Sequence, residues 1–265
     1  MELTTIIGIV IGILAIIGAM IFKQIHFKVF INPAALLIIF VGTAAAVLNA
    51  YPGKNLKTLG ALFKILFTKQ KMITEVEIIE LMVNLSAVAK KDGLLALEGK
   101  VEEIEDPFIK KAVRMVADGT EKDIIQEILE TEITAMEKRH DINAGIFASA
   151  GMYAPTLGVL GAVFGLIAAM SSIDDTDNMA TAIAAAFIAT ILGLFTGYVL
   201  WSPFSKKLKV KSQQEVMLKS MVIEGVQSIQ RGDPPFMLKE RLLAVLPTKK
   251  QQKVIEELEK EKEKE

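Results

Sequence analysis

The chain has 265 residues, a formal net charge of −1 at pH 7, a hydrophobic fraction of 52% and a mean hydropathy of +0.42. This composition is too apolar for an ordinary soluble domain and indicates a membrane protein with soluble portions, and the balanced charge gives no reason to expect a nucleic-acid partner. There is no cysteine, which excludes disulfides and thiolate chemistry, and only two histidines, which argues against a histidine-based metal or catalytic cluster.

Four apolar runs are long enough to cross a membrane as helices, at residues 3–22, 33–51, 146–170 and 179–201. None contains Asp, Glu, Lys, Arg or His, and each is close to or above the roughly 20 residues that a bilayer core requires. The first run has no basic segment before it and exceeds the apolar length of a signal peptide, so we expect a retained helix. The sequence therefore predicts an all-α integral membrane protein with four transmembrane helices, two within residues 1–51 and two within 146–203.

The basic residues predict the orientation of these helices. Of the 30 Lys and Arg residues, 14 lie in 52–145 and 14 in 204–265, whereas the connection 23–32 has two and the connection 171–178 has none. By the positive-inside rule, 52–145, 204–265 and both termini are cytoplasmic. We therefore expect a multi-pass protein of the cytoplasmic membrane, with a helical cytoplasmic domain inserted between helices 2 and 3 and completed by the C-terminal tail.

Small residues recur in the apolar runs at a spacing of four, as in Gly8/Gly12. Such pairs let helix backbones approach closely, although glycine is also simply common in membrane helices. The chain has three such pairs, Gly8/Gly12, Gly161/Gly165 and Gly193/Gly197, and together they favour tight packing. We expect the third helix to pack against a neighbouring subunit or a partner helix. The glycines assigned to packing in the third and fourth helices are Gly158, Gly161, Gly165, Gly193 and Gly197.

Residues 52–145 show capping signals for cytoplasmic helices. Thr74 and Glu77 form a T-x-x-E capping box, and Gly93 marks the end of the helix that they open. Asp106 followed by proline predicts an N-cap with proline at the first helical position, and that helix ends near Gly119.

A long amphipathic pattern then continues into the third apolar run. If it is continuous over 121–170, the helix is about 75 Å long at 1.5 Å per residue, and the alternative is a break around 141–145. Beyond residue 204, the pattern predicts separate helices at about 213–230 and 237–246 with a turn at 232–235, and the alternating charges of EELEKEKEKE predict a solvated helical or frayed tail.

The chemistry available within the membrane is limited. The sequence contains no nucleotide-binding, hydrolase or zinc-protease motif, so no enzyme is predicted. Transporters normally keep ionisable groups in their spans, and these four spans have no charged side chain, only a few polar ones such as Thr190 and Tyr198. Either this protein moves no ions, or a partner brings the carboxylate.

Two prolines direct attention to the third and fourth helices. Pro155 and Pro203 both fall in the cytoplasmic half of their helices, where each permits a bend and frees one backbone carbonyl. If Pro155 lies roughly 10 Å deeper than Pro203, counting residues outward from each proline places Ala162 and Thr190 near one level at mid-membrane. The alternative for Thr190 is a hydroxyl bonded back to the carbonyl four residues earlier in its own helix.

Several segments together resemble one family. The segments are YAPTLGVLGAVFGLIAAM, SSIDDTD, AFIATILGLFTGYVLWSPF, KKDGLLALE, EGVQSIQRGDPP and NPAALLIIFVGT. In order and spacing they are similar to MotA-type flagellar motor stator subunits, over about residues 1–250.

The resemblance implies a pentameric ring around two copies of MotB, a single-span, peptidoglycan-anchored protein whose helix carries the ion-binding Asp. Ion passage would rotate the ring, and the cytoplasmic domain would push on the rotor protein FliG. No cofactor is implied apart from the transported ion, and no enzymatic activity.

The resemblance also implies roles for individual residues. Pro155 and Pro203 match the two family prolines, Thr190 matches the threonine that faces the ion-binding Asp, and Tyr198 lies on the same part of the fourth helix. Sodium-driven relatives tend to have a threonine where this chain has Ala162, so the resemblance favours protons, because a hard cation wants several oxygen ligands.

The charged residues implied for rotor contact are Lys90 and Glu98. The family commonly has arginine at the first position, and Lys91 follows directly, so both lysines are candidates. The alternative is that these residues are merely solvated surface charges.

Two other functions compete with the stator. A TolQ/ExbB-type energy-transducing subunit uses the same ring around a partner, but such proteins typically have three spans. An unrelated membrane scaffold or receptor would leave the prolines and the glycine pairs unexplained.

Overall fold

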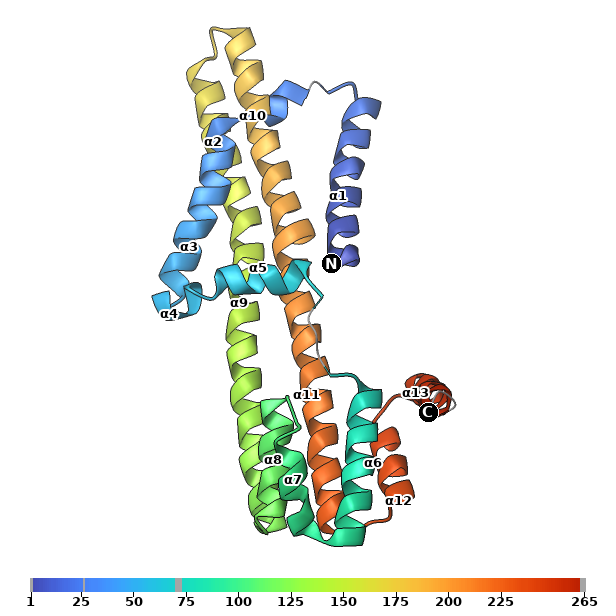
Figure 1. The fold of residues 1–265 in the computed structure, drawn as a ribbon. Coiled ribbons are helices and arrows are strands. Elements are labelled where there is room, and N and C mark those ends of the chain that lie inside the picture. Colours follow the sequence, from blue (N-terminus) through green and yellow to red (C-terminus); the bar gives the residue numbers. More distant parts are fainter. Residues whose placement is uncertain (1, 26, 70–72, 263–265) are drawn as a thin grey trace. The chain divides into compact units, whose positions relative to one another are not determined.

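The computed structural model describes residues 2–25, 27–69 and 73–262, which form helices joined by short connections and contain no strand (Figure 1). Contacts divide the chain into two compact units. The span unit comprises Met1–Gln70 with Arg139–Lys211, and the helical unit comprises Lys71–Lys138 with Ser212–Glu265. These divisions fall at residues 70, 138 and 211, whereas the sequence suggested 51, 145 and 203.

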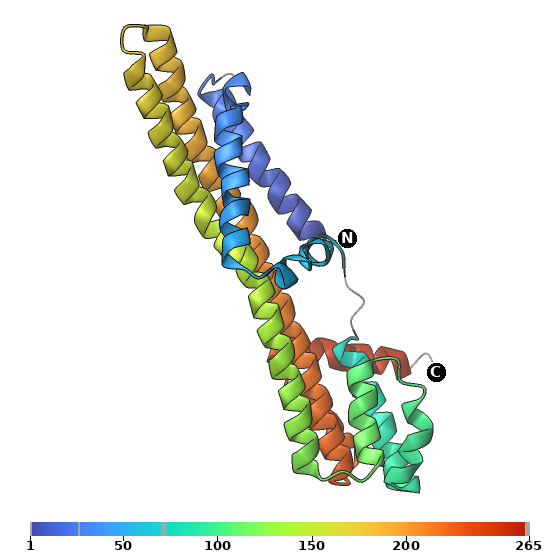
Figure 2. The ribbon, with the colours of Figure 1, turned by 90° about the vertical axis from the view of Figure 1, so that its left-hand side faces the viewer.

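The span unit holds four helices that are long and apolar enough to cross a membrane. The first is α1 (Leu3–Phe22), and the second combines α2 (Pro33–Leu36), the π-helical η2 (Leu37–Val41) and α3 (Gly42–Ala50). The third and fourth belong to α9 (Lys122–Ser171) and α10 (Thr176–Phe195), which lie side by side in both Figure 1 and Figure 2. The all-α, four-span fold predicted from the sequence is confirmed.

Helix α9 runs for 50 residues without interruption, so the alternative break at 141–145 is not present. The fourth helix is also longer than expected. After α10, the chain passes through the π-helical η4 (Thr196–Trp201) directly into α11 (Ser202–Gln230), giving one helix over Thr176–Gln230.

The expectation that the fourth helix ends at Pro203, with a separate helix at 213–230, is therefore wrong. Pro203 lies inside this continuous helix, two residues after the π turn η4 ends at Trp201. Its missing N–H removes one bond of the helical ladder, and the irregular hydrogen bonding is taken up by that π turn.

A short helix that the sequence did not indicate packs in the span unit. The chain after α3 forms α4 (Gly53–Leu56) and α5 (Leu59–Phe67). Leu62 and Leu66 of α5 are buried against Phe147 and Phe204, which come from α9 and α11. The Phe63, Phe147 and Phe204 rings meet edge to face.

The helical unit follows the predicted caps. Thr74 and Glu77 form the capping box of α6 (Glu75–Asp92), which ends at Gly93, and the Asp106 side chain caps α8 (Pro107–Ala117). Between them lie η3 (Leu94–Leu97) and α7 (Glu98–Val101), and after Gly232 come α12 (Pro235–Ala244) and α13 (Thr248–Lys262).

One core joins these helices to the adjoining parts of α9 and α11, with Ile78, Met82, Ile109, Leu129 and Met221 almost completely buried. The segment EELEKEKEKE, expected to be solvated, begins within α13, and its Leu258 enters this core together with Val254. Lys250 adds an ion pair to Glu75. Residues 263–265 of the charged tail lie outside the described residues.

Candidate functional site

Helices α9 and α10 approach each other closely along their backbones in the span unit. A Cβ atom added to Gly193 would lie 2.8 Å from the Ala154 carbonyl oxygen and 2.8 Å from Gly158 Cα. One turn away, a Cβ on Gly161 would lie 3.0 Å from Ala189 Cβ. These glycines let the two backbones touch with no side chain between them.

The same seam extends to both ends of the pair. A Cβ on Gly165 would lie 2.8 Å from Ala186 Cβ, and one on Gly197 would lie 2.6 Å from Pro155 Cγ. All five predicted glycines thus pack within one chain, between its third and fourth helices. This differs from the expectation that the third helix uses them against a neighbouring subunit or a partner.

The seam sets the level of the candidate pathway residues. Because Gly161 faces Ala189, their chain neighbours Ala162 and Thr190 lie at the same level, as the residue count suggested. Both are half-buried. The Thr190 hydroxyl donates to the Ala186 carbonyl at 3.3 Å, which is the alternative considered for this residue. A bond of that length is weak.

The two prolines stand in different surroundings. Pro155 lies inside α9, which continues past it, and its ring fills the space that a side chain at Gly197 would need. Pro203 is exposed at the start of α11. The ring of Pro155 is therefore held by packing against η4, whereas the ring of Pro203 is exposed.

Sequence reasoning missed the π turn η4, which contains Tyr198. Thr196 is buried there and its hydroxyl donates to the Leu192 carbonyl at 2.8 Å and to the Gly193 carbonyl at 3.2 Å. Tyr198 is 65% exposed. π turns inside α-helices occur often at functional sites, and a threonine before glycine and proline is too weak a signal to predict one.

The charged residues considered for rotor contact belong to the helical unit. Lys90 and Lys91 end α6, where positive charge suits the helix dipole, and Glu98 begins α7. All three are exposed, and none takes part in an ion pair within the described residues. They are available to a partner, although exposure alone does not assign one.

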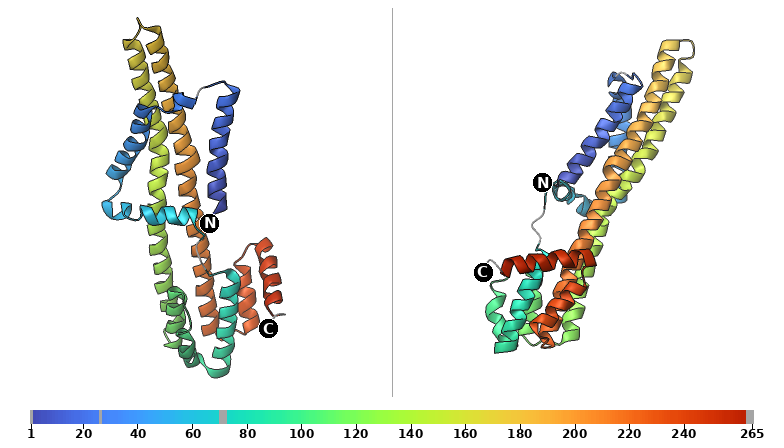
Figure 3. Two further views of the ribbon diagram at one scale, coloured as in Figure 1. Left: turned by 45° about the horizontal axis from the view of Figure 1, so that its top comes forward. Right: turned by 90° about the vertical axis from the view of Figure 1, so that its right-hand side faces the viewer.

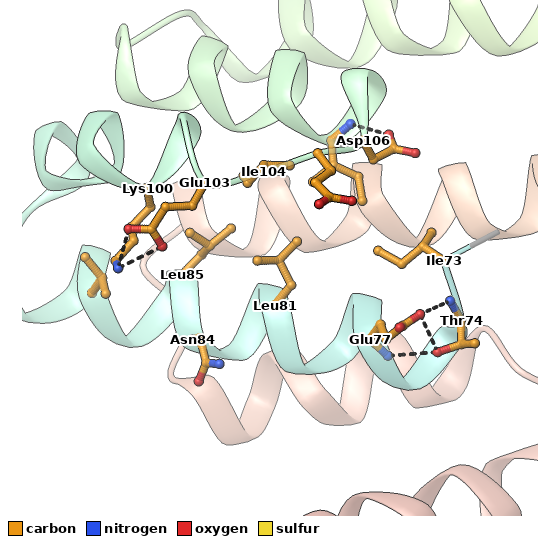
Figure 4. Close-up of a pocket in the computed structure, with 13 residues that line it drawn as sticks. Ile73, Thr74, Glu77, Leu81, Asn84, Leu85, Lys100, Glu103, Ile104 and Asp106 are labelled. Carbon is orange, nitrogen blue, oxygen red and sulfur yellow. Dashed lines mark hydrogen bonds and ion pairs between the residues drawn. The ribbon is translucent and has the colours of Figure 1, made fainter. Parts of the chain in front are cut away.

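A groove of about 720 Å³ lies beside α6 in the same unit. Leu81 and Leu85 point from α6 toward Ile104, and the Lys100–Glu103 ion pair lies at one end (Figure 4). The sequence did not predict this groove, because its two walls come from segments about 20 residues apart.

Comparison with known proteins decides the family. A profile of the MotA/TolQ/ExbB proton channel family matches residues 100–221. The motility protein A of Bacillus subtilis is 47% identical to this chain over 257 residues, covering 97% of this chain and 95% of that relative. This chain belongs to the motility protein A family.

Solved structures agree with the sequence match. The flagellar MotAB stator complex from Bacillus subtilis has a chain that is 47% identical, with a TM-score of 0.88 and coverage of 94% of this chain and 97% of that one. The MotAB structure from C. jejuni gives the same TM-score at 31% identity, with the same coverage. The similarity therefore extends over all four candidate spans and both units.

Proposed function

We propose that this chain is the ring-forming subunit of a flagellar stator, in which ion passage is converted into torque. The observation that carries this proposal is a set of four spans without a charged side chain, in a chain similar over 97% of its length to a motility protein A. A TolQ/ExbB-type role is less well supported, because that similarity includes the fourth span and residues 52–145.

The missing carboxylate points to a partner. A permeating ion needs a polar or charged group at mid-membrane, and the similar structures are of MotAB complexes. The partner is a single-span, peptidoglycan-anchored MotB-like protein whose membrane Asp binds the ion, surrounded by five copies of this chain. The protein has no catalytic residue and needs no cofactor.

The transported ion is the proton. Ala162 offers no hydroxyl beside Thr190, and the Thr190 hydroxyl points to the Ala186 carbonyl. A sodium ion would find one oxygen ligand fewer there, and a hard cation wants several. Swimming should therefore persist without sodium and stop when a protonophore collapses the proton gradient. Swimming that requires sodium would contradict this assignment.

The distribution of charged residues supports a membrane orientation and a surface for contact with the rotor. Residues 52–145, 204–265 and both termini face the cytoplasm. Lys90, Lys91 and Glu98 lie on that side and contact charged residues of the rotor protein FliG.

The test is complementation of a strain that lacks its own ring subunit and its own partner. Expression of this chain together with its partner should restore swimming, and expression of either one alone should not. Restored swimming by this chain alone, or failure of the pair while both reach the membrane, would reject the stator assignment.

A further inference from the structure

The first residues of α1, the end of α5 and the start of α11 meet around one carboxylate in the span unit. The Glu2 carboxylate forms two ion pairs, with Lys207 Nζ at 3.0 Å and with Lys211 Nζ at 2.8 Å. The three side chains are 24%, 22% and 19% exposed. The pKa of Glu2 is lowered to about 2, mainly by the hydrogen bonds from Lys211 and Lys207, so the carboxylate is charged at any physiological pH.

The same residues complete the end of α5. The last four carbonyls of a helix have no partner inside it. Here the Ile65 carbonyl accepts from Lys211 Nζ at 2.8 Å, the Leu66 carbonyl from the Thr5 hydroxyl at 3.1 Å, and the Phe67 carbonyl from the Glu2 N–H at 3.0 Å. Three of the four carbonyls are therefore capped by α1 and α11, and Figure 3 shows the end of α5 beside the N-terminus in both views.

Pro203 shares a helix face with both lysines. Pro203, Lys207 and Lys211 are spaced by four, which aligns their side chains along α11. One turn before Pro203, α1 packs tightly, since a Cβ on Gly12 would lie 2.7 Å from Val199 Cγ1. Between this contact and the carboxylate, a hollow of about 180 Å³ separates α1 from Pro203, and Thr4, Thr5 and Lys207 also line it.

We propose that Glu2, Lys207 and Lys211 are positioning residues that clamp α1 and α5 to the start of α11 while the Pro203 turn moves in the hollow beside it. This inference rests on the proposed stator function. The clamp holds one end of the turn and the Gly12 contact holds the other, so a displacement at Pro203 passes into α11 instead of detaching α1. α11 continues unbroken to Gln230.

Charge exchange separates this role from a general need for a charged residue. Glu2→Lys puts three cations together and removes both ion pairs of the clamp, whereas Glu2→Lys with Lys207→Glu restores one anion between two cations. Lys206→Glu is the matched control, because Lys206 is exposed one residue away on the same helix. Glu2→Lys also adds positive charge on the side already predicted to be cytoplasmic, so it does not favour inversion.

In the strain lacking its own stator, Glu2→Lys should lower the rotation speed of tethered cells severalfold, because ion pairs no longer tie the start of α11 to α1. Membrane abundance and binding to the partner should stay near wild type. The exchanged pair should recover at least half of the speed, and Lys206→Glu should rotate normally. Normal rotation of Glu2→Lys, or no recovery in an exchanged pair that is present in normal amount, would overturn the clamp.

A second measurement does not depend on torque. Trp201 is the single tryptophan of the chain, stacks on Phe147 and lies two residues before Pro203. In purified protein, its emission should shift to the red in Glu2→Lys and return in the exchanged pair. If wild type fails to restore swimming, the stator assignment fails and this emission alone decides the clamp. Identical spectra would reject it. If Glu2→Lys does not accumulate, Glu2→Gln takes its place in both measurements.

Discussion

Adding one methyl group to Gly193 should force α9 and α10 apart. The new Cβ would lie 2.8 Å from both the Ala154 carbonyl oxygen and Gly158 Cα. Both atoms belong to the backbone of α9, which cannot give way as a flexible side chain would. The matched control is Gly18→Ala in α1, where a Cβ meets nothing within 4 Å.

The expected cost is that of overpacking, about 1–3 kcal/mol. Both variants gain the same intrinsic helix propensity, up to about 1 kcal/mol, so this gain cancels in the comparison. For a domain of this size, each kcal/mol lowers the melting temperature by about 2–4 °C. Gly193→Ala should therefore melt about 2–12 °C below Gly18→Ala.

The assay is thermal unfolding of the purified full chain in detergent, followed by circular dichroism. Both variants are compared with wild type at one protein and detergent concentration. Equal melting temperatures for Gly193→Ala and Gly18→Ala would refute the close contact between α9 and α10 within one chain.

Three further predictions address the prolines, the rotor contact and acid stability. Pro155→Ala and Pro203→Leu should each impair swimming while partner binding in pull-downs persists, and normal swimming would show that the prolines are only structural. Glu98→Lys should lower torque and be partly rescued by charge reversal on the rotor, and the absence of rescue by every rotor reversal would argue against direct contact. The pKa of Asp233 is lowered, chiefly by the Ser228 hydroxyl and also by Arg231, with burial opposing, so its stabilisation is present above about pH 4 and lost as pH falls below. The melting temperature of Asp233→Asn should therefore fall less between pH 6 and pH 3 than that of wild type. An equal fall in both proteins would exclude this carboxylate as a source of acid sensitivity.

Local signals predicted most of the helices because they act within a few residues. The capping box at Thr74 and the Asp106–Pro107 start each depend on neighbours no more than three positions away. The four apolar runs depend only on length and composition. Such features survive whatever the rest of the fold does.

The predictions that failed concern features that depend on contacts between residues far apart in the sequence. A glycine pair permits close packing but does not name the partner, so the seam of Gly158 with Gly193 could equally have faced another chain. Pro203 suggested the end of a helix, since proline removes a backbone hydrogen bond. The π turn that lets the helix continue past it cannot be predicted from residue propensities. The Glu2 cluster joins residues about 200 positions apart, and no local pattern announces such an ion pair.

Ion flux into sealed vesicles tests most directly the proposal that a partner supplies the ion-binding carboxylate. Vesicles would contain this chain alone, this chain with its single-span partner, or this chain with a partner whose membrane Asp is changed to Asn. Proton uptake should appear only with the unchanged partner. Robust uptake by this chain alone, or equal uptake with the Asn partner, would contradict a borrowed carboxylate.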